Sequence, residues 1–570
     1  MTHGAPSVEP GPPAASFPTA LERTGPGLLS GGRALSLMAY ALAAIVALPI
    51  LGILASLFGA PGDTWPHLRD TLLPVMAANS LILMIGTGIG VILIGVATAW
   101  LVTTCAFPGR RVFEWALVLP LAIPTYVLAY IYTDFLQHPG AVQTALRAAT
   151  GWGPRDYWFP EIRSLEGAIL LFSLAFYPYV YLLARTAFLQ QSLVMLEASR
   201  SLGCSPWESF WRVALPLARP AIAAGAALAL METLAEFGAV SHFGLQTLTT
   251  GIYRLWFSFG DRILAVQLSG ALVTLALVLL VFERWNRGQA RYDDARGRLA
   301  APSRMSLSPG MKLAAVLTCA GPVVLGFVLP VGLLVHLSIT VGHDLLDADT
   351  LRLIGNSLTL ATLGAGAAVA VALLLAYAAR LHPGRAVQWM NRMASMGYAL
   401  PGTVIAVGIL LPLAQFDNMV DATARWAFGL STGLIFTGTI LALIYAYVVR
   451  FLSVSLGAVD AALARITPNM EAAARALGAG SLGTLWRIHA PMMSGGMLTA
   501  GLIVFVDVIK ELPATLILRP FNFDTLAIQA YRLASDERLG EASTASLVIV
   551  VAGLIPVIVL SRTIARTGAP

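Results

Sequence analysis

Two apolar stretches of this 570-residue chain each carry a pair of carboxylates spaced four residues apart. Glu232 and Glu236 form the first pair, and Asp507 and Glu511 occupy the corresponding positions 275 residues later. Residues at this spacing lie on one face of a helix. A charged side chain at the centre of a membrane span costs at least ~2.5 kcal/mol on insertion scales, so each carboxylate needs a partner or a wet path. Four carboxylates brought together by a pseudo-twofold axis would line a route for a cation.

Lys510 offers a second interpretation of the same residues. It follows Asp507 by three positions, so the two side chains can form a structural ion pair on one helix face. A carboxylate near the end of a span can also act simply as a helix cap. If the acids conduct a hard trivalent cation, the site must be weak, and Lys510 would weaken it by reducing the negative field. No metal site is assigned, because His242, near the expected outer mouth, has no counterpart in the repeat.

A longer repeat with the same offset precedes each acidic stretch. Residues 196–220 read LEASRSLGCSPWESFWRVALPLARP, and residues 471–495 read EAAARALGAGSLGTLWRIHAPMMSG. In each copy, good helix formers lead to a glycine that is expected to be left-handed and to end a helix. A Trp-Arg pair and a proline follow, which predicts a second short helix and then the next span. The residues that mark these hairpins are Glu197, Ala198, Arg200, Gly203, Trp211, Arg212 and Pro216, and Glu471, Ala473, Arg475, Gly478, Trp486, Arg487 and Pro491.

Each hairpin falls in a polar, arginine-bearing loop between apolar spans. Trp and Arg are residues that suit a protein interface. A single copy could be an ordinary helical hairpin, which also needs a glycine turn and a proline. Two copies with the same Leu, Gly, Trp, Arg and Pro positions favour docking of a partner outside the bilayer.

Membrane-spanning helices must position these residues. The chain is 57% hydrophobic and 12% charged, with a mean hydropathy of +0.76, which excludes an ordinary water-soluble core. A helical span needs ~20 apolar residues, so the sequence predicts an all-α polytopic membrane protein with twelve spans in two parallel six-helix repeats. The spans are expected near 35–58, 76–104, 115–136, 165–188, 219–241 and 264–283, and near 312–338, 356–380, 393–413, 431–455, 494–517 and 543–562.

The chain divides into a tail, two halves and a linker. Residues 1–33 are expected to be a disordered cytoplasmic tail, 34–285 and 312–570 the two halves with one hairpin each, and 286–311 a basic cytoplasmic linker. Cytoplasmic loops carry the Lys/Arg excess, so the linker places both termini and both hairpins in the cytoplasm. The same bias accounts for the net charge of +6, and no nucleic-acid partner is expected.

The hairpins resemble the EAA motif of binding-protein-dependent (type I) ABC importer permeases. That motif reads EAA, three residues, Gly, nine residues, then a hydrophobic residue, x and Leu-Pro. The first copy matches it at Glu197, Ala198, Gly203, Leu215 and Pro216. The second copy matches at Ala473, Gly478 and Pro491, but Glu471 stands one place early. The resemblance implies that each hairpin is a coupling helix seated in a cleft of an ATP-hydrolysing subunit.

ATP hydrolysis is expected outside this chain. A phosphate-binding P-loop needs Gly-Lys followed by Ser or Thr. The two lysines of the chain, Lys312 and Lys510, follow Met311 and Ile509 instead. The chain is therefore predicted to be a transport subunit rather than an enzyme, and to bind no cofactor. The resemblance implies two ABC ATPase subunits that bind ATP and Mg, one for each hairpin, and a periplasmic substrate-binding protein.

A further resemblance concerns the cargo. Residues 231–261 and 507–542 are similar to fused permeases for ferric iron, and the similarity extends over both halves. It implies a bacterial inner-membrane subunit that moves ferric iron from periplasm to cytoplasm by alternating access. Permeases for thiamine, 2-aminoethylphosphonate, polyamines or oxyanions share the architecture and are alternatives. So is an ion-coupled secondary transporter, although it would not need paired hairpins. The loops expected to dock the binding protein are 59–75, 137–164, 242–263, 414–430 and 518–542.

Overall fold

Helices account for almost all of the fold. The computed structural model describes residues 26–60, 65–190, 199, 203, 205–288, 305–342, 344, 346–381, 384–464 and 466–567. Within these ranges the only strands are β1 (Cys105–Ala106) and β2 (Met305–Ser306), which pair in parallel. The all-α membrane fold predicted from the sequence is therefore confirmed.

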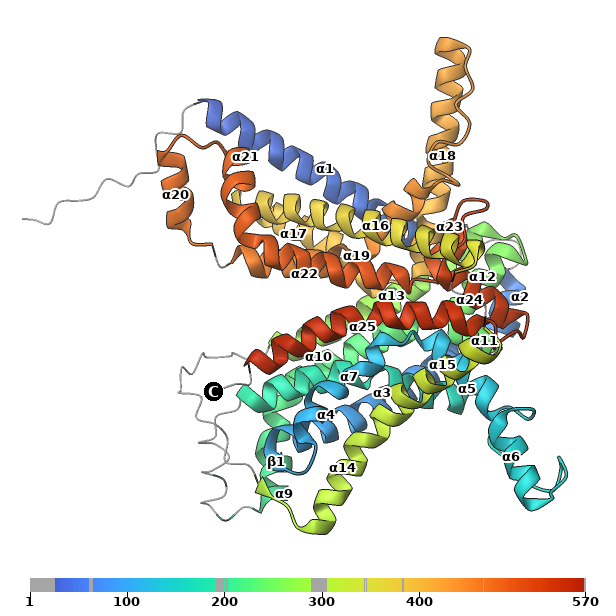
Figure 1. Ribbon diagram of the computed structural model, residues 1–570. Coiled ribbons are helices and arrows are strands. Elements are labelled where there is room, and N and C mark those ends of the chain that lie inside the picture. The colour runs from blue at the N-terminus through green and yellow to red at the C-terminus, as the bar shows by residue number, and fades with distance from the viewer. Residues whose placement is uncertain are drawn as a thin grey trace, which may run out of the picture.

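The two halves contain corresponding sets of helices, in which η marks 3-10 and π turns (Figure 1). The first half consists of α1 (Pro26–Ser56), α2 (Trp65–His67), η1 (Leu68–Leu72), α3 (Leu73–Thr104), α4 (Arg110–Ala116), η2 (Leu119–Ala122), α5 (Thr125–Leu136), α6 (Ala141–Thr150), α7 (Leu165–Gln190), α9 (Pro206–Ser209), η3 (Phe210–Ala214), α10 (Leu215–Ala235), α11 (Gly238–His242), α12 (Leu248–Phe257) and α13 (Arg262–Gly288). The second half consists of α14 (Pro309–Val323), η4 (Val324–Val328), α15 (Leu329–Thr340), α16 (Ala348–Leu381), α17 (Arg385–Ala394), η5 (Ser395–Ala399), α18 (Gly402–Phe428), α19 (Ile440–Leu463), α20 (Pro468–Ala476), α21 (Ser481–Thr484), η6 (Leu485–His489), α22 (Ala490–Ile509), α23 (Pro513–Leu518), α24 (Leu526–Ser535) and α25 (Ala542–Thr567).

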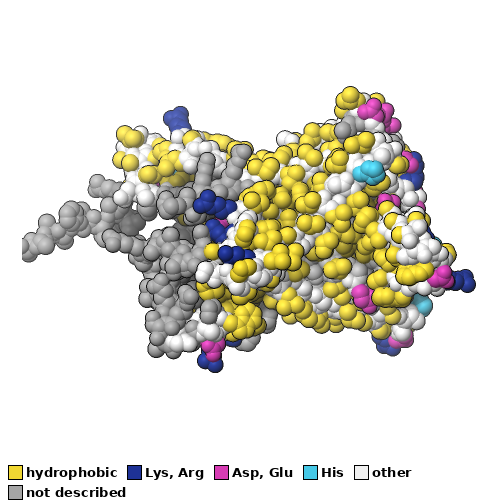
Figure 2. Space-filling view, turned by 60° about the horizontal axis from the view of Figure 1, so that its bottom comes forward, with side chains coloured by type: hydrophobic (Ala, Val, Ile, Leu, Met, Phe, Trp, Pro, Cys, Tyr) yellow, Lys and Arg dark blue, Asp and Glu magenta, His cyan; other side chains and the backbone are white. Residues whose placement is uncertain are grey.

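Eleven helices in the described part of the chain are long and apolar enough to cross a membrane, and one bent pair makes a twelfth. Figure 2 shows the matching surface, in which hydrophobic side chains cover the middle of the visible face and charged ones lie toward its ends. The bent pair is the third span, where the segments 110–122 and 125–150 meet at 90°. The bend lies within the span predicted at 115–136, because Pro124 holds Ile123 in an extended conformation and ends the helix.

Four spans contain a five-residue π turn, and each turn has a proline two residues after its end. The turns η1, η3, η4 and η6 precede Pro74, Pro216, Pro330 and Pro491. Proline lacks an N–H group and its ring clashes with the carbonyl four residues earlier, so the wider turn accommodates it without breaking the helix. The helices that contain the fifth spans therefore begin at residues 207 and 482, ahead of the span starts predicted near 219 and 494. The second helix of each hairpin runs directly into its span.

The first helix starts earlier than predicted. Proline is favoured in the first turn of a helix, and α1 begins at Pro26. Its first turns thus occupy residues 26–33, the end of the predicted cytoplasmic tail, and the candidate membrane span within it covers Leu37–Ser56. Residues 1–25 and 289–304, which include most of the predicted linker, lie outside the described residues.

The two halves exchange their first helices. Helix α1 packs against α16, α17 and α18 of the second half, and the Tyr445 hydroxyl donates to the Ile45 carbonyl at 2.5 Å. Helix α14 packs against α3 and α4 of the first half, and the Tyr132 hydroxyl donates to the Leu325 carbonyl at 2.5 Å. Each lobe of the molecule thus contains helices from both halves. In Figure 1 the lobes meet near α11 and α23 and diverge toward the end that carries α9 and α20.

Candidate functional site

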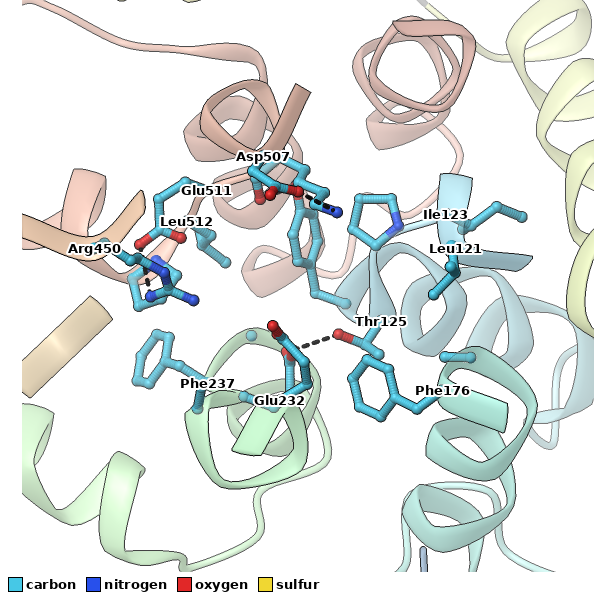
Figure 3. Close-up of a pocket in the computed structure, with 18 of the residues that line it drawn as sticks. Leu121, Ile123, Thr125, Phe176, Glu232, Phe237, Arg450, Asp507, Glu511 and Leu512 are labelled. Carbon is cyan, nitrogen blue, oxygen red and sulfur yellow. Dashed lines mark hydrogen bonds and ion pairs between the residues drawn. The ribbon is translucent and has the colours of Figure 1, made fainter. Parts of the chain in front are cut away.

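A cavity lies where the two halves meet, at the ends of α10 and α22. The structure places all four predicted carboxylates in its lining, together with Lys510. Figure 3 shows Asp507 and Glu511 on one side of the cavity and Glu232 on the other. The two acidic pairs, far apart in the sequence, therefore share one site.

The second acid of each pair is a helix cap. Span α10 ends before Glu236, whose Oε1 accepts a hydrogen bond from the Ala239 N–H of α11 at 2.9 Å. In the second half Glu511 Oε1 accepts from the Ala514 N–H of α23, also at 2.9 Å. A carboxylate at a helix N-terminus satisfies free N–H groups and is stabilised by the helix dipole. The capping alternative for the carboxylates thus applies to Glu236 and Glu511.

The other partner of these caps differs between the halves. The Thr125 hydroxyl donates to Glu236. In the second half Gly402 occupies the corresponding first position of α18, and Arg450 Nη1 lies 3.3 Å from Glu511 Oε1. A Cβ added to Gly402 would clash with Glu511 Oε1 and lie 2.5 Å from Arg450 Nη1. The absence of a side chain at 402 is what makes room for this ion pair.

The first acid of each pair faces the cavity. Asp507 Oδ1 lies 2.8 Å from Lys510 Nζ, as the ion-pair interpretation of the sequence requires. Glu232 lies on the other side of the cavity, whose lining also includes Tyr398, Arg450 and Lys510. Among the described residues, no group of three or more His, Cys, Asp or Glu side chains could hold a metal ion. The cavity is acidic without being a preformed chelating cage.

Repeated asparagines hold the chain just beyond the cavity. Asn79 Nδ2 donates to the Gln246 carbonyl at 3.0 Å, and Asn356 Nδ2 donates to the Asp524 carbonyl at 2.9 Å. The serine after each asparagine accepts the N–H of the first residue of α12 or α24. The same bonds in both halves fix the loops that follow the capped helices. They explain why the Asn-Ser pair recurs in the sequence.

The two hairpins lie at the end of the molecule opposite α11 and α23, one on each of the diverging lobes (Figure 1). Gly203 and Gly478 have φ values of +88° and +82°, which confirms the predicted left-handed turns. Trp211 and Trp486 are 53% and 61% exposed, and the arginine after each of them is exposed too. The hairpins thus present bulky apolar and cationic side chains to solvent on one end of the molecule.

Part of the predicted hairpin set is not described. Glu197, Ala198 and Arg200 lie outside the described residues, as does the side chain of Arg475. Ala473, in α20, is exposed.

An ion pair anchors the second hairpin from within. Arg380, at the end of α16, has its Nε 2.5 Å from Glu471 Oε1 and donates to the carbonyls of Leu463 and Ile466 at 2.6 and 2.5 Å. The buried His489 places Nε2 3.4 Å from the same carboxylate oxygen. The Glu471 side chain is only 13% exposed, so it contacts the base of the hairpin more than its docking surface.

Aromatic packing anchors the first hairpin instead. The ring centroid of Trp100 is 5.4 Å from that of Phe188 and 4.9 Å from that of Phe210. The Trp207 ring stacks on Phe210 at 5.6 Å. In the described part of the first hairpin, large buried rings lie where the second hairpin has its ion pair.

Sequence reasoning missed the residues that partner the cavity carboxylates. These are Thr125 and Arg450, together with Gly402, whose lack of a side chain leaves room for Arg450. Only Arg450 carried a signal, because it is a single charge within an apolar span.

The fold and these sites define a polytopic membrane transport protein built from a duplicated six-span unit. A family model agrees: the binding-protein-dependent transport system inner membrane component matches residues 92–286 and again residues 368–567. These matches cover more than half of the chain, so the chain belongs to this family. It is a permease subunit of the ABC importer class, with two permease domains fused in one chain, as the hairpin motif suggested.

Two relatives that match across both halves of the chain are iron permeases. The chain is 27% identical to the Fe(3+)-transport system permease protein FbpB 2 of Haemophilus influenzae over 492 residues, 85% of this chain and 89% of that protein. It is 23% identical to the ferric transport system permease protein FbpB of Actinobacillus pleuropneumoniae, over 80% of this chain and 66% of that protein. The molybdenum transport system permease protein ModB of Escherichia coli K12 is 29% identical over 200 residues, 34% of this chain and 83% of that protein.

Proposed function

We propose that this chain is the permease of an ATP-driven, binding-protein-dependent importer that carries ferric iron from the periplasm to the cytoplasm. The observation that carries the proposal is the similarity to iron permeases across both halves, with 85% of the chain covered by one relative. The molybdenum permease matches over only one third of the chain.

The cavity is consistent with a hard cation as cargo. Four carboxylates and two cationic side chains line it, so acid is in excess. Carboxylate oxygens suit hard metal ions. The lobes meet at the cavity and diverge toward the hairpins. If they instead closed at the hairpin end and separated at the opposite end, the cavity would open to the other side of the membrane.

The hairpins supply the coupling. Each one docks in a separate ABC ATPase subunit, through an exposed surface that includes Trp211 and Arg212 in the first half and Trp486 and Arg487 in the second. ATP and Mg bind in those two subunits, and this chain hydrolyses no ATP. Both termini and both hairpins face the cytoplasm, and the substrate-binding protein docks at the opposite end.

An oxyanion is the second candidate cargo. Arg450 and Lys510 line the cavity, and cationic side chains are what an oxyanion would need. Both cations lie against carboxylates, at 3.3 and 2.8 Å, so an anion would have to displace a carboxylate to reach either of them. Ferric iron is therefore the stronger assignment.

Transport by the reconstituted importer tests the assignment. Proteoliposomes that contain the chain, its two ATPase subunits and ATP should accumulate radioactive iron delivered by the binding protein, and excess molybdate should not compete. Liposomes without the ATPase are the control and should show no uptake. Uptake without ATPase would mean a secondary transporter, and uptake of molybdate without iron would mean an oxyanion permease.

A further inference from the structure

Three charged groups of the cavity remain after the two capping carboxylates and Arg450, which pairs with one of them, are accounted for. Glu232 and Asp507 occupy equivalent positions in the two halves, and Lys510, which pairs with Asp507, is the lining cation that no capping carboxylate engages. The residue equivalent to Lys510 in the first half is Ala235, which also lines the cavity. The ammonium group of Lys510 thus has no counterpart in the first half, and the cavity is asymmetric at this position.

Arg450, the other cation that lines the cavity, is part of a structural contact and differs from Lys510 in this way. The side chains of Arg450 and Glu511 are 11% and 4% exposed, and the space left by Gly402 is filled by their contact. Glu511 is also committed to the Ala514 N–H. Arg450 therefore completes a structural cap, as Thr125 does in the first half.

Lys510 has the properties of a movable group. Its side chain is 32% exposed, and its partner Asp507 is 17% exposed. Lysine carries a compact charge on a flexible four-carbon stem. Lys510 also follows the last residue of α22, where a cation is stabilised by the helix dipole whether or not it touches Asp507. The ammonium group therefore stays in a favourable electrostatic field when it moves away from the Asp507 carboxylate.

We propose that Lys510 is a tethered counter-cation that occupies the carboxylate site of Glu232 and Asp507 while the cavity is empty and is displaced by the cationic cargo. Two carboxylates in a partly dehydrated cavity repel each other and attract any available cation. The ammonium group neutralises one of them and so prevents stray ions from occupying the site. After the cargo leaves, the ammonium returns to Asp507. This role rests on the proposed function, because it requires a cationic cargo.

Binding of Tb³⁺, a hard trivalent cation with a luminescent signal, tests the displacement. Purified wild-type chain in nanodiscs should bind Tb³⁺ weakly, and Lys510→Met should bind it at least tenfold more tightly. Addition of Glu232→Gln and Asp507→Asn to Lys510→Met should abolish the gain. Lys312→Met is the matched control, because it removes the only other lysine of the chain and should leave Tb³⁺ binding unchanged. Equal Tb³⁺ affinity in wild type and Lys510→Met would overturn the proposal.

Amine labelling provides a second measurement in a chain that keeps Lys510. In Lys312→Arg, Lys510 is the sole lysine, and peptide mass analysis separates its label from that of the N-terminal amine. Saturating Tb³⁺ should increase the labelling rate of Lys510 at least threefold, and an unchanged rate would also overturn the proposal. Neither experiment uses transport. Failure of iron uptake would therefore reject the cargo assignment without deciding the role of Lys510.

Discussion

In the first half of the molecule the capping carboxylate Glu236 accepts a hydrogen bond from the neutral hydroxyl of Thr125, whereas its counterpart Glu511 pairs with the guanidinium of Arg450. The hairpin bases repeat this contrast. Aromatic rings pack beneath the first hairpin, and the second is held by Arg380 and Glu471. Among the residues that the structure describes, the contacts seen at both sites are neutral in the first half and charged in the second.

The features that both halves keep, in spite of this difference in contacts, are those that the duplicated fold requires. Positive-φ glycines, π-turn prolines and Asn-Ser pairs are common to both halves, because they determine where helices end and how loops return. The groups that satisfy a buried carboxylate can vary, provided that one is present. Loss of one member of a buried ion pair leaves an uncompensated charge, so the second half should be the more sensitive to substitution.

The largest effect is expected at Gly402. Gly402→Val should destabilise the protein by more than about 4 kcal/mol, because its side chain would collide with Glu511 and Arg450 and separate them. Thr125→Ala, the matched change in the first half, removes one hydroxyl donor and should cost about 1–3 kcal/mol. Thermal unfolding in detergent measures both. Equal losses of stability in the two variants would contradict the proposed difference between the Arg450 and Thr125 contacts.

A smaller loss is expected from the ion pair under the second hairpin. Arg380→Met should cost about 3–5 kcal/mol and lower ATPase stimulation, because Glu471 and two carbonyls lose their donor. Arg352→Met lies on the same helix, where Arg352 makes only an exposed pair with Asp349, and should cost less than about 1 kcal/mol. Adding Glu471→Gln to Arg380→Met should recover part of the stability. If both arginine variants unfold alike, the pair does not anchor the hairpin.

The glycine turns should respond equally in the two halves. Gly203→Val and Gly478→Val should each cost about 1–2 kcal/mol, because a branched side chain is disfavoured at positive φ although space is open at both sites. In the reconstituted importer both should also weaken the coupling of ATP hydrolysis to uptake. Gly480→Val is the control, since Gly480 has open space without a positive φ. Similar ATPase coupling in all three variants would show that the turn geometry is not needed.

The smallest effect concerns an exposed contact between the halves. Arg163 Nη2 lies 2.9 and 2.8 Å from the two carboxylate oxygens of Glu537, and its hydrogen bond lowers the pKa of Glu537 from the usual 4.5. A lowered folded-state pKa means that the contact stabilises above pH 4.5 and is lost as pH falls through the folded value. Glu537 is 60% exposed, so the contribution should stay below about 1 kcal/mol. Glu537→Gln should remove the contribution of this contact from the pH dependence of the free energy of unfolding. An unaltered pH profile in the variant would contradict the prediction.

Prolines illustrate how far the sequence could predict the structure. The spans were visible as apolar runs, and Gly203 and Gly478 were identifiable because few other residues adopt positive φ. Pro124 and Pro216 were equally visible, yet Pro124 ends a helix and Pro216 lies within one behind a π turn. Which outcome occurs depends on the neighbouring groups that satisfy the freed carbonyls, and those come from tertiary packing.

The sequence by itself determined that the protein is embedded in lipid, that it is duplicated, and that its span acids occur in equivalent pairs, because composition and repeat spacing are properties of the chain alone. The tertiary structure decided the roles of those acids. Helical periodicity places Asp507 and Glu511 on one face, but it does not show that α22 ends between them or that Glu511 meets Arg450, which is 61 residues away. A buried charge is defined by partners on other helices, and only the folded chain brings those partners together.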